Sequence, residues 1–214
     1  MKKVKIEDLL KREIRKPNEQ LLKQDIEKKN ILITGAGGSI GSELCRQVIR
    51  QNPQLLILFD ISEFALYSIE RELLEINSDA TIIPILGNVT KCSRLGKLIK
   101  KFKVHTIYHS AAYKHVPMVE KNTVAGIEAN IFGTLSCIEA AIDGNVGSFV
   151  FISTDKAVRP TNTMGATKRF AELILQAIAK RQATRATHNE TQISIVRFGN
   201  VLDSSGSVVP LFRQ

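Results

Sequence analysis

The chain has few residues of the kinds that build disulfides or metal sites. Its three cysteines, Cys45, Cys92 and Cys137, are odd in number, far apart and without paired spacing, so the sequence predicts neither a disulfide framework nor a zinc site. We interpret them as small buried apolar residues. His105 and His109 alternate with strand residues and are expected to pack or to face solvent. No spacing of histidine, cysteine and aspartate indicates a metal anywhere.

Long hydrophobic runs are also missing. No run reaches the roughly 18 consecutive apolar residues that a membrane-spanning helix needs, and the basic amino terminus leads into an amphipathic segment instead of the apolar stretch of a signal peptide. We therefore expect a soluble, cytoplasmic chain that makes no membrane contact of its own. Its 214 residues, 43% of them hydrophobic, are enough for one α/β domain with a well-buried core.

Aromatic residues are scarce where the positive charge gathers. The formal net charge is +9, and basic residues crowd about the first thirty positions, where acidic residues are interleaved as on a solvated helix face or a linker. No aromatic side chains alternate with them for base stacking, so we expect no nucleic-acid partner. An excess of basic residues is also compatible with the binding of a phosphorylated small molecule.

Short β-branched runs alternate with segments of helical period through most of the chain. This pattern is typical of βαβ units and predicts an α/β fold, a Rossmann-type doubly wound parallel sheet. We expect residues 28–214 to form this domain, residues 1–27 to form a helical linker docked loosely on it, and the smaller carboxyl-terminal substrate domain to be largely missing. Strands are predicted at residues 30–34, 55–59, 81–86, 105–109, 148–152 and 192–197, and helices at 40–50, 63–75, 93–102, 123–142 and 164–181.

A glycine-rich turn follows the first predicted strand. Gly35 permits the tight turn, Gly38 lets the backbone approach a pyrophosphate, and Gly41 allows the helix to pack closely on the strand. Amides at the start of the helix, together with the helix dipole, can then hold phosphates. The turn therefore predicts a dinucleotide site, with contacts from Thr34, Gly35, Gly37, Gly38, Ser39, Ile40 and Gly41.

Asp60 closes the second predicted strand, about twenty residues beyond the glycine turn. A carboxylate at this place can hold the adenosine ribose hydroxyl groups, and it repels the 2′-phosphate of NADP. No arginine follows it in Ile61, Ser62 and Glu63. We therefore predict NAD as the cofactor and regard NADP as the less favoured choice.

Four further segments carry a resemblance to a known family. They read Ser-Ala-Ala-Tyr-Lys-His-Val at 110–116, Asn-Ile-Phe-Gly-Thr at 130–134, Ser-Thr-Asp-Lys at 153–156 and Arg-Phe-Gly-Asn-Val at 197–201. Together with the TGxxGxxG pattern of the glycine turn, they resemble the extended short-chain dehydrogenase/reductase superfamily. Within it they are similar to the polysaccharide-biosynthesis branch of UDP-N-acetylglucosamine 4,6-dehydratases.

This resemblance implies a nucleotide-sugar reaction. It implies a UDP-sugar substrate and a 4-keto-6-deoxy sugar product for surface polysaccharide or glycan biosynthesis. It also implies a homo-oligomer assembled through the two long predicted helices, 123–142 and 164–181. The resemblance implies in addition that this chain is part of a longer protein, which is anchored at the cytoplasmic face of the inner membrane.

Met164 stands where most of the superfamily has the tyrosine of a Tyr-x-x-x-Lys pair, and Lys168 is the lysine of that pair. The tyrosine of the family exchanges a proton with the substrate alcohol, whereas a thioether cannot carry a proton at any useful pH. Either the domain is catalytically inactive or another group handles the proton. We favour the second interpretation, because the branch that the chain resembles has active members with methionine at this position.

The resemblance assigns the chemistry to Thr154, Asp155 and Lys156. Lys156 would remove the proton from carbon 5 of the sugar, Asp155 would protonate the departing 6-hydroxyl group, and Thr154 would hydrogen-bond the oxygen on carbon 4. An exposed lysine is charged and an exposed aspartate is ionised near neutral pH. We therefore expect burial in a closed site to shift the pKa of both groups. The alternative is an ordinary surface ion pair after a strand.

Several further positions are candidates by resemblance or by their place after a strand. Arg159 and Arg197 could pair with a diphosphate or form structural ion pairs. Asp203 stands where relatives usually have glycine, so the contacts of the following loop are less certain. The remaining cofactor candidates are Asn88, Val89, Ala111, Ala112, Lys114, Asn130 and Lys168, and the substrate candidates are Lys114, His115, Thr154, Asn200, Ser207 and Val208.

Two other functions stay open at this point. A UDP-sugar 4-epimerase would use the same scaffold, but it has no water to eliminate and so no need for Asp155 and Lys156 as an acid and base pair. A non-catalytic NAD-binding module would explain Met164.

Overall fold

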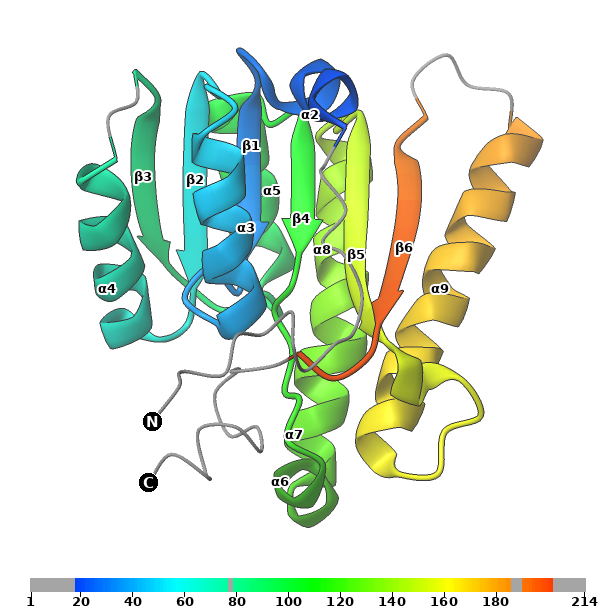
Figure 1. Ribbon diagram of the computed structural model, residues 1–214. Coiled ribbons are helices and arrows are strands. Elements are labelled where there is room, and N and C mark those ends of the chain that lie inside the picture. Colours follow the sequence, from blue (N-terminus) through cyan, green and yellow to red (C-terminus); the bar gives the residue numbers. More distant parts are fainter. Residues whose placement is uncertain (1–17, 77–78, 186–189, 202–214) are drawn as a thin grey trace, which may run out of the picture.

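One parallel sheet organises the chain. The computed structural model describes residues 18–76, 79–185 and 190–201, and in these ranges six strands lie in the order β3-β2-β1-β4-β5-β6 (Figure 1). The predicted Rossmann-type sheet is confirmed, and each predicted strand agrees with the observed one to within two residues at either end. The strands are β1 (Asn30–Thr34), β2 (Leu55–Asp60), β3 (Thr81–Leu86), β4 (Thr106–His109), β5 (Ser148–Thr154) and β6 (Gln192–Phe198).

Helices cover both faces of this sheet. Buried side chains of α2, α3 and α4 pack with one another against Ile31 and Ile33 of β1, and those of α5, α8 and α9 pack on the other face against Leu32 and Phe151. The order of strands reverses between β1 and β4, which is the point where open α/β sheets bind ligands at the carboxyl ends of their strands. The helices are α2 (Glu19–Ile26), α3 (Ser39–Ile49), α4 (Glu63–Leu74), α5 (Cys92–Phe102), α6 (Val116–Lys121), α7 (Thr123–Ile127), α8 (Gly133–Asp143) and α9 (Thr163–Arg185).

The predicted helix over residues 123–142 is wrong as a single α-helix. It consists of α7, a π-helical turn η1 (Glu128–Phe132) and α8. The π turn has 5 residues, which is shorter than the window of about 11–18 residues over which hydrophobic periodicity is read, so that pattern did not reveal it. Asn130, which is completely buried, lies in the middle of this turn.

The segment before β1 is tied to the domain by its last turn. Ile26 of α2 is only 3% exposed and packs in the same core as α3 and α4, and the Thr106 hydroxyl group donates to the Asp25 carbonyl oxygen at 3.3 Å. In the part of the chain that is described, no helix is long and apolar enough to cross a membrane. Cys45 and Cys137 are buried as predicted, whereas Cys92 is partly exposed.

Candidate functional site

The glycine turn lies at the carboxyl end of β1, and its backbone geometry requires glycine. Gly35 adopts a φ of +68°, which L residues with a side chain rarely adopt, and a Cβ there would lie 2.7 Å from Ala111 Cα. A Cβ on Gly41 would overlap the Gly35 carbonyl oxygen. The Gly38 amide donates to that same oxygen at 3.1 Å, so the turn folds tightly back onto the start of α3.

Asp60 ends β2 beside this turn and is 8% exposed. Its Oδ2 accepts the Gly37 N–H and its Oδ1 accepts the Ser62 N–H, both at 2.9 Å. The carboxylate is therefore held in one orientation by two backbone amides from opposite sides. Each oxygen keeps a further lone pair with which it can accept a ligand hydroxyl group.

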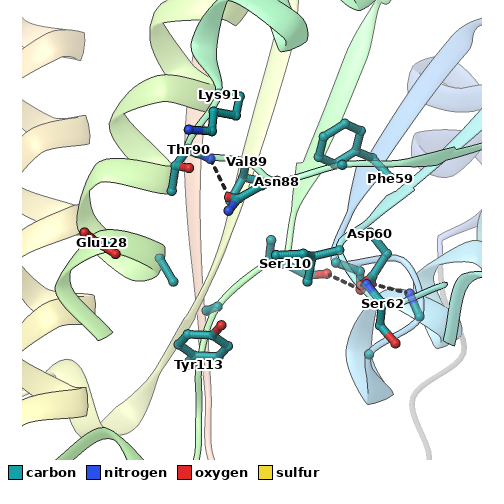
Figure 2. Close-up of a pocket in the computed structure, with 18 of the residues that line it drawn as sticks. Phe59, Asp60, Ser62, Asn88, Val89, Thr90, Lys91, Ser110, Tyr113 and Glu128 are labelled. Atoms are coloured by element: carbon teal, nitrogen blue, oxygen red, sulfur yellow. Dashed lines mark hydrogen bonds between the residues drawn. The ribbon is translucent and has the colours of Figure 1, made fainter. Parts of the chain in front are cut away.

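A cavity of about 760 Å³ opens between the glycine turn, the end of β2 and the loops that follow β3 and β4. Figure 2 shows Asp60 and Ser62 on one side of it and Glu128 of the π turn on the other. Asn88 lies between them, with its side-chain oxygen accepting the Thr90 N–H at 2.9 Å. Of the predicted cofactor residues, those that line the cavity are Gly35, Gly37, Gly38, Asp60, Asn88, Val89, Ala111 and Ala112.

The other predicted cofactor residues do not line this cavity, and two of them belong to a buried hydrogen-bond chain. His109, which is fully buried, lies between the hydroxyl groups of Thr34 (2.6 Å from Nδ1) and Thr134 (3.1 Å from Nε2). Thr134 donates its only proton to the Asn130 carbonyl oxygen at 2.7 Å, so His109 must donate from Nε2 and accept from Thr34 at Nδ1. Burial, and secondarily the charge of Lys168, lowers the pKa of His109 to about 3, so the ring is neutral.

Asn130 connects this chain to the cavity wall. Its side-chain oxygen accepts the Tyr113 N–H at 2.8 Å, and its Nδ2 donates to the Tyr113 carbonyl oxygen at 3.0 Å and to Thr167 Oγ1 at 2.9 Å. The π turn therefore holds the segment after β4 and the first turn of α9 in place. Asn130, which the sequence predicts as a cofactor residue, does not line the cavity itself but fixes Tyr113, which does.

Met164 and Lys168 are both buried, at 4% and 5% exposure. The Lys168 ammonium group donates to the Ile152 carbonyl oxygen at 2.7 Å and lies 4.0 Å from the centre of the Phe151 ring. Burial lowers the pKa of Lys168 to about 7, although the nearby Glu172 charge acts in the opposite direction. Met164 offers no titratable group here.

Lys114 and His115 lie on the exposed loop that enters α6. Lys114 Nζ approaches Ser39 Oγ at 3.5 Å, which brings a positive charge toward the start of α3. Partial burial lowers the pKa of Lys114. His115 precedes the first residue of α6 and makes no side-chain capping hydrogen bond.

Thr154, Asp155 and Lys156 meet at the carboxyl end of β5. Asp155 Oδ1 accepts from Thr154 Oγ1 at 3.1 Å and from Lys156 Nζ at 3.4 Å. Lys156 Nζ also donates to Asn200 Oδ1 at 2.8 Å, so four predicted site residues form one polar cluster. The cluster thus contains an ion pair between Asp155 and Lys156, which is the alternative that the sequence left open.

The expected burial of this acid and base is not observed. The Asp155 and Lys156 side chains are 57% and 36% exposed. Desolvation acts to raise the pKa of the Asp155 carboxyl group, but the Thr154 hydrogen bond and the Lys156 charge outweigh it, and the pKa is lowered. The Asp155 carboxyl group is therefore ionised near neutral pH in this structure.

Two predicted substrate residues, Ser207 and Val208, and the nearby Asp203 lie outside the described residues. Of the two arginines considered for a diphosphate, Arg197 forms a two-bond ion pair with Glu172, at 2.8 and 2.6 Å, and so has the structural role. Arg159 is exposed after the 3-10 turn η2 (Asp155–Ala157).

Sequence reasoning did not identify part of the cavity wall. In the sequence Tyr113 stood out only as part of the segment 110–116 that resembles the family. Glu128 is the first residue of the π turn η1, which no sequence pattern indicated. Ser62 carried the signal of a helix N-cap, and its hydroxyl group does accept the Ala65 N–H. The unpredicted lining residues are Phe59, Ile61, Ser62, Ala65, Gly87, Thr90, Lys91, Ser110, Tyr113, Ala125, Glu128, Ala129 and Phe132.

The sheet order, the glycine turn and the cavity beside it define a Rossmann-type domain of the short-chain dehydrogenase/reductase class. The sequence matches the family described as "Polysaccharide biosynthesis protein" over residues 31–214. The chain therefore belongs to this polysaccharide biosynthesis protein family.

Curated relatives carry names from polysaccharide and nucleotide-sugar metabolism. Capsular polysaccharide biosynthesis protein CapD of Staphylococcus aureus is 44% identical over the whole chain, which covers 35% of that relative. A UDP-N-acetylglucosamine 4,6-dehydratase (inverting) of Campylobacter jejuni is 32% identical over 87% of the chain and 53% of the relative. A UDP-glucose 4-epimerase of Rickettsia canadensis is 35% identical over 86% of the chain and 52% of the relative. The chain thus spans about a third to a half of the length of these relatives.

Solved structures share the fold. Pen from Bacillus thuringiensis superposes with a TM-score of 0.80 at 34% identity, over 88% of this chain and 57% of that one. DesIV, a dTDP-glucose 4,6-dehydratase from Streptomyces venezuelae solved with NAD and TYD bound, gives a TM-score of 0.72 at 22% identity, over 86% and 60%. Relatives of this chain thus include proteins named as nucleotide-sugar dehydratases and epimerases.

Proposed function

We propose that this chain is the NAD-binding and catalytic domain of a nucleotide-sugar 4,6-dehydratase that acts on UDP-N-acetylglucosamine. The observation that carries the proposal is the polar cluster of Thr154, Asp155, Lys156 and Asn200 at the same sheet edge as the glycine turn. An epimerase needs no such acid and base pair. The name of the Campylobacter jejuni relative supports the choice of sugar.

The residues around the cavity fit a nicotinamide dinucleotide. The glycines of the turn line the cavity without side chains just before α3, so a pyrophosphate can approach the backbone and the start of that helix. Asp60 lines the cavity as an acceptor for ribose hydroxyl groups, and Asn88 and Val89 line the part where an adenine ring would lie. Ala111 and Ala112 leave room beside the backbone. Bound NAD would supply temporary storage for the hydride of carbon 4, which returns to carbon 6.

The protein groups supply the proton transfers. Thr154 hydrogen-bonds the oxygen on carbon 4, and Asp155 accepts the proton of the 4-hydroxyl group as the hydride leaves carbon 4. Lys156 then takes the proton from carbon 5, and Asp155 gives its proton to the departing 6-hydroxyl group, which leaves as water. Lys156 returns a proton to carbon 5 when the hydride is returned to carbon 6. Because Asp155 is ionised and exposed in the open site, we propose that the sugar covers the pair and raises the pKa of this carboxyl group by desolvation. Met164 takes no part in proton transfer.

Incubation of the intact protein with NAD and UDP-N-acetylglucosamine in deuterated water tests the proposed reaction. We expect a 4-keto-6-deoxy sugar with one solvent deuterium at carbon 5, because the proton that Lys156 removes exchanges with solvent. Nuclear magnetic resonance of the product measures both features. A product epimerised at carbon 4 without deuterium at carbon 5 would instead identify a 4-epimerase, a function that the 35% identity to the Rickettsia canadensis epimerase favours.

Cofactor choice depends in this proposal on the Asp60 charge. Asp60→Asn keeps an oxygen that can accept one backbone amide but removes the charge that repels a 2′-phosphate. We expect the preference for NAD over NADP to fall about 10- to 150-fold, since a hydrogen bond to a charged group contributes about 1.5–3 kcal/mol. Calorimetric titration with both cofactors measures the ratio. Glu63→Gln, which removes a neighbouring charge in the first turn of α4, should leave it unchanged, and an unchanged ratio in Asp60→Asn would refute the assignment.

Exposed apolar side chains support the expected homo-oligomer. Phe170 and Leu173 of α9 are about half exposed, and Val124 of α7 is 71% exposed. A group of such side chains on neighbouring helices is typical of a protein interface. We propose that the chain assembles through this surface.

A further inference from the structure

A buried carboxylate on α9 joins the ends of two strands beside the polar cluster. Glu172 is completely buried. It accepts hydrogen bonds from Ser153 Oγ of β5 at 2.6 Å, from Arg197 Nε and Nη2 of β6 at 2.8 and 2.6 Å, and from Arg169 Nη1 of its own helix at 3.0 Å. Desolvation acts to raise the pKa of Glu172, but these hydrogen bonds outweigh it and lower the pKa to about 2. The group is therefore ionised at any ordinary pH.

The contacts of Glu172 fall immediately before the proposed catalytic residues. Ser153 and Arg197 are register partners in the β5 and β6 ladder. Thr154 is the next residue of β5, and Asn200 lies two positions beyond Phe198, the last residue of β6. The contact between Lys156 Nζ and Asn200 Oδ1 then bridges the two segments beyond the strands.

The polar cluster cannot hold its own geometry firmly. Asp155 and Lys156 are 57% and 36% exposed, and exposed ion pairs contribute little because solvent screens them and long side chains lose entropy. A two-bond arginine and carboxylate pair is stronger and directional. The stiff element next to the cluster is therefore the Glu172 network.

We propose that Glu172, acting through Arg197 and Ser153, is a positioning residue that sets the separation of Lys156 and Asn200 and so aims Lys156 at carbon 5 of the sugar. This inference rests on the proposed function for its effect on turnover, but its effect on geometry exists without substrate. Small displacements of a catalytic group are enough to slow a reaction strongly.

Two arginine variants separate positioning from general stability. Arg197→Gln cuts the link between α9 and β6, whereas Arg169→Gln removes an arginine from the same carboxylate within one helix. We expect kcat to fall about 10- to 100-fold in Arg197→Gln, with the KM for UDP-N-acetylglucosamine and the NAD affinity nearly unchanged, and to change little in Arg169→Gln. Equal losses of kcat in the two variants would overturn the proposal. If Arg197→Gln does not fold, Ser153→Ala makes the same comparison by cutting the link to β5.

A spectroscopic measurement keeps the test independent of the reaction. The side-chain amide signals of Asn200, identified by their loss in Asn200→Ala, should shift in the ligand-free Arg197→Gln protein and stay in place in Arg169→Gln. Unshifted signals in both variants overturn the positioning role. If the wild-type protein does not convert UDP-N-acetylglucosamine but the signals shift as expected, the proposed function is wrong and the positioning role stands.

Discussion

Replacement of Lys156 by methionine is expected to reduce kcat by about 10²- to 10⁴-fold, the usual contribution of a positioned general base. Methionine keeps most of the length of the side chain but cannot accept the proton from carbon 5. Oxidation at carbon 4 does not need that base, so a 4-keto sugar that retains its 6-hydroxyl group should accumulate. Mass spectrometry of quenched single-turnover reactions measures this intermediate.

The matched control for Lys156→Met is Lys180→Met. Lys180 is an exposed lysine of α9, distant in sequence from the cluster, and its replacement should leave kcat at the wild-type value. Full formation of the 4-keto-6-deoxy product by Lys156→Met would assign the base to another group. Failure of the variant to oxidise carbon 4 at all would show that Lys156 acts earlier in the reaction than we propose.

Gly41→Ala should lower both the thermal stability of the domain and its affinity for NAD, more than any other substitution proposed here. An added Cβ would overlap the Gly35 carbonyl oxygen and lie 2.7 Å from the Gly35 carbonyl carbon, so α3 must move away from β1. Overpacking against rigid backbone costs about 3 kcal/mol, which corresponds to a Tm lower by roughly 6–12 °C in a domain of this size. Because the same movement opens the phosphate-binding turn, NAD affinity should fall at least about 100-fold. Thermal unfolding and calorimetry measure the two effects.

Gly96→Ala provides a control of opposite sign. Gly96 lies within α5, and an added Cβ there would meet nothing within 4 Å. Alanine in a helix interior is favoured over glycine by about 0.5–1 kcal/mol, so Tm should rise by about 1–4 °C with NAD affinity unchanged. If Gly41→Ala raised Tm as Gly96→Ala does, the close packing of α3 on β1 described above would be wrong.

The fold was largely predictable because its signals are local. Each strand is a short apolar run bounded by polar or turn residues, and Gly35, Gly38 and Gly41 mark the first strand-to-helix turn by their spacing alone. The π turn around Asn130 was not predicted, since a single π turn is shorter than the window over which helical periodicity is read. The exposure of Asp155 and Lys156 was also missed, because burial depends on elements that pack from elsewhere in the chain.

By itself the sequence determined the order of strands and helices, the glycine turn and the place of Asp60 at the end of β2, since each depends on neighbours within a few residues. Only the tertiary structure decided which distant side chains meet. His109 joins Thr34 to Thr134, and Glu172 joins Ser153 to Arg197, across separations of 19 to 75 residues. Such contacts arise where the crossing of helices over a parallel sheet brings side chains together, and no local periodicity encodes that crossing.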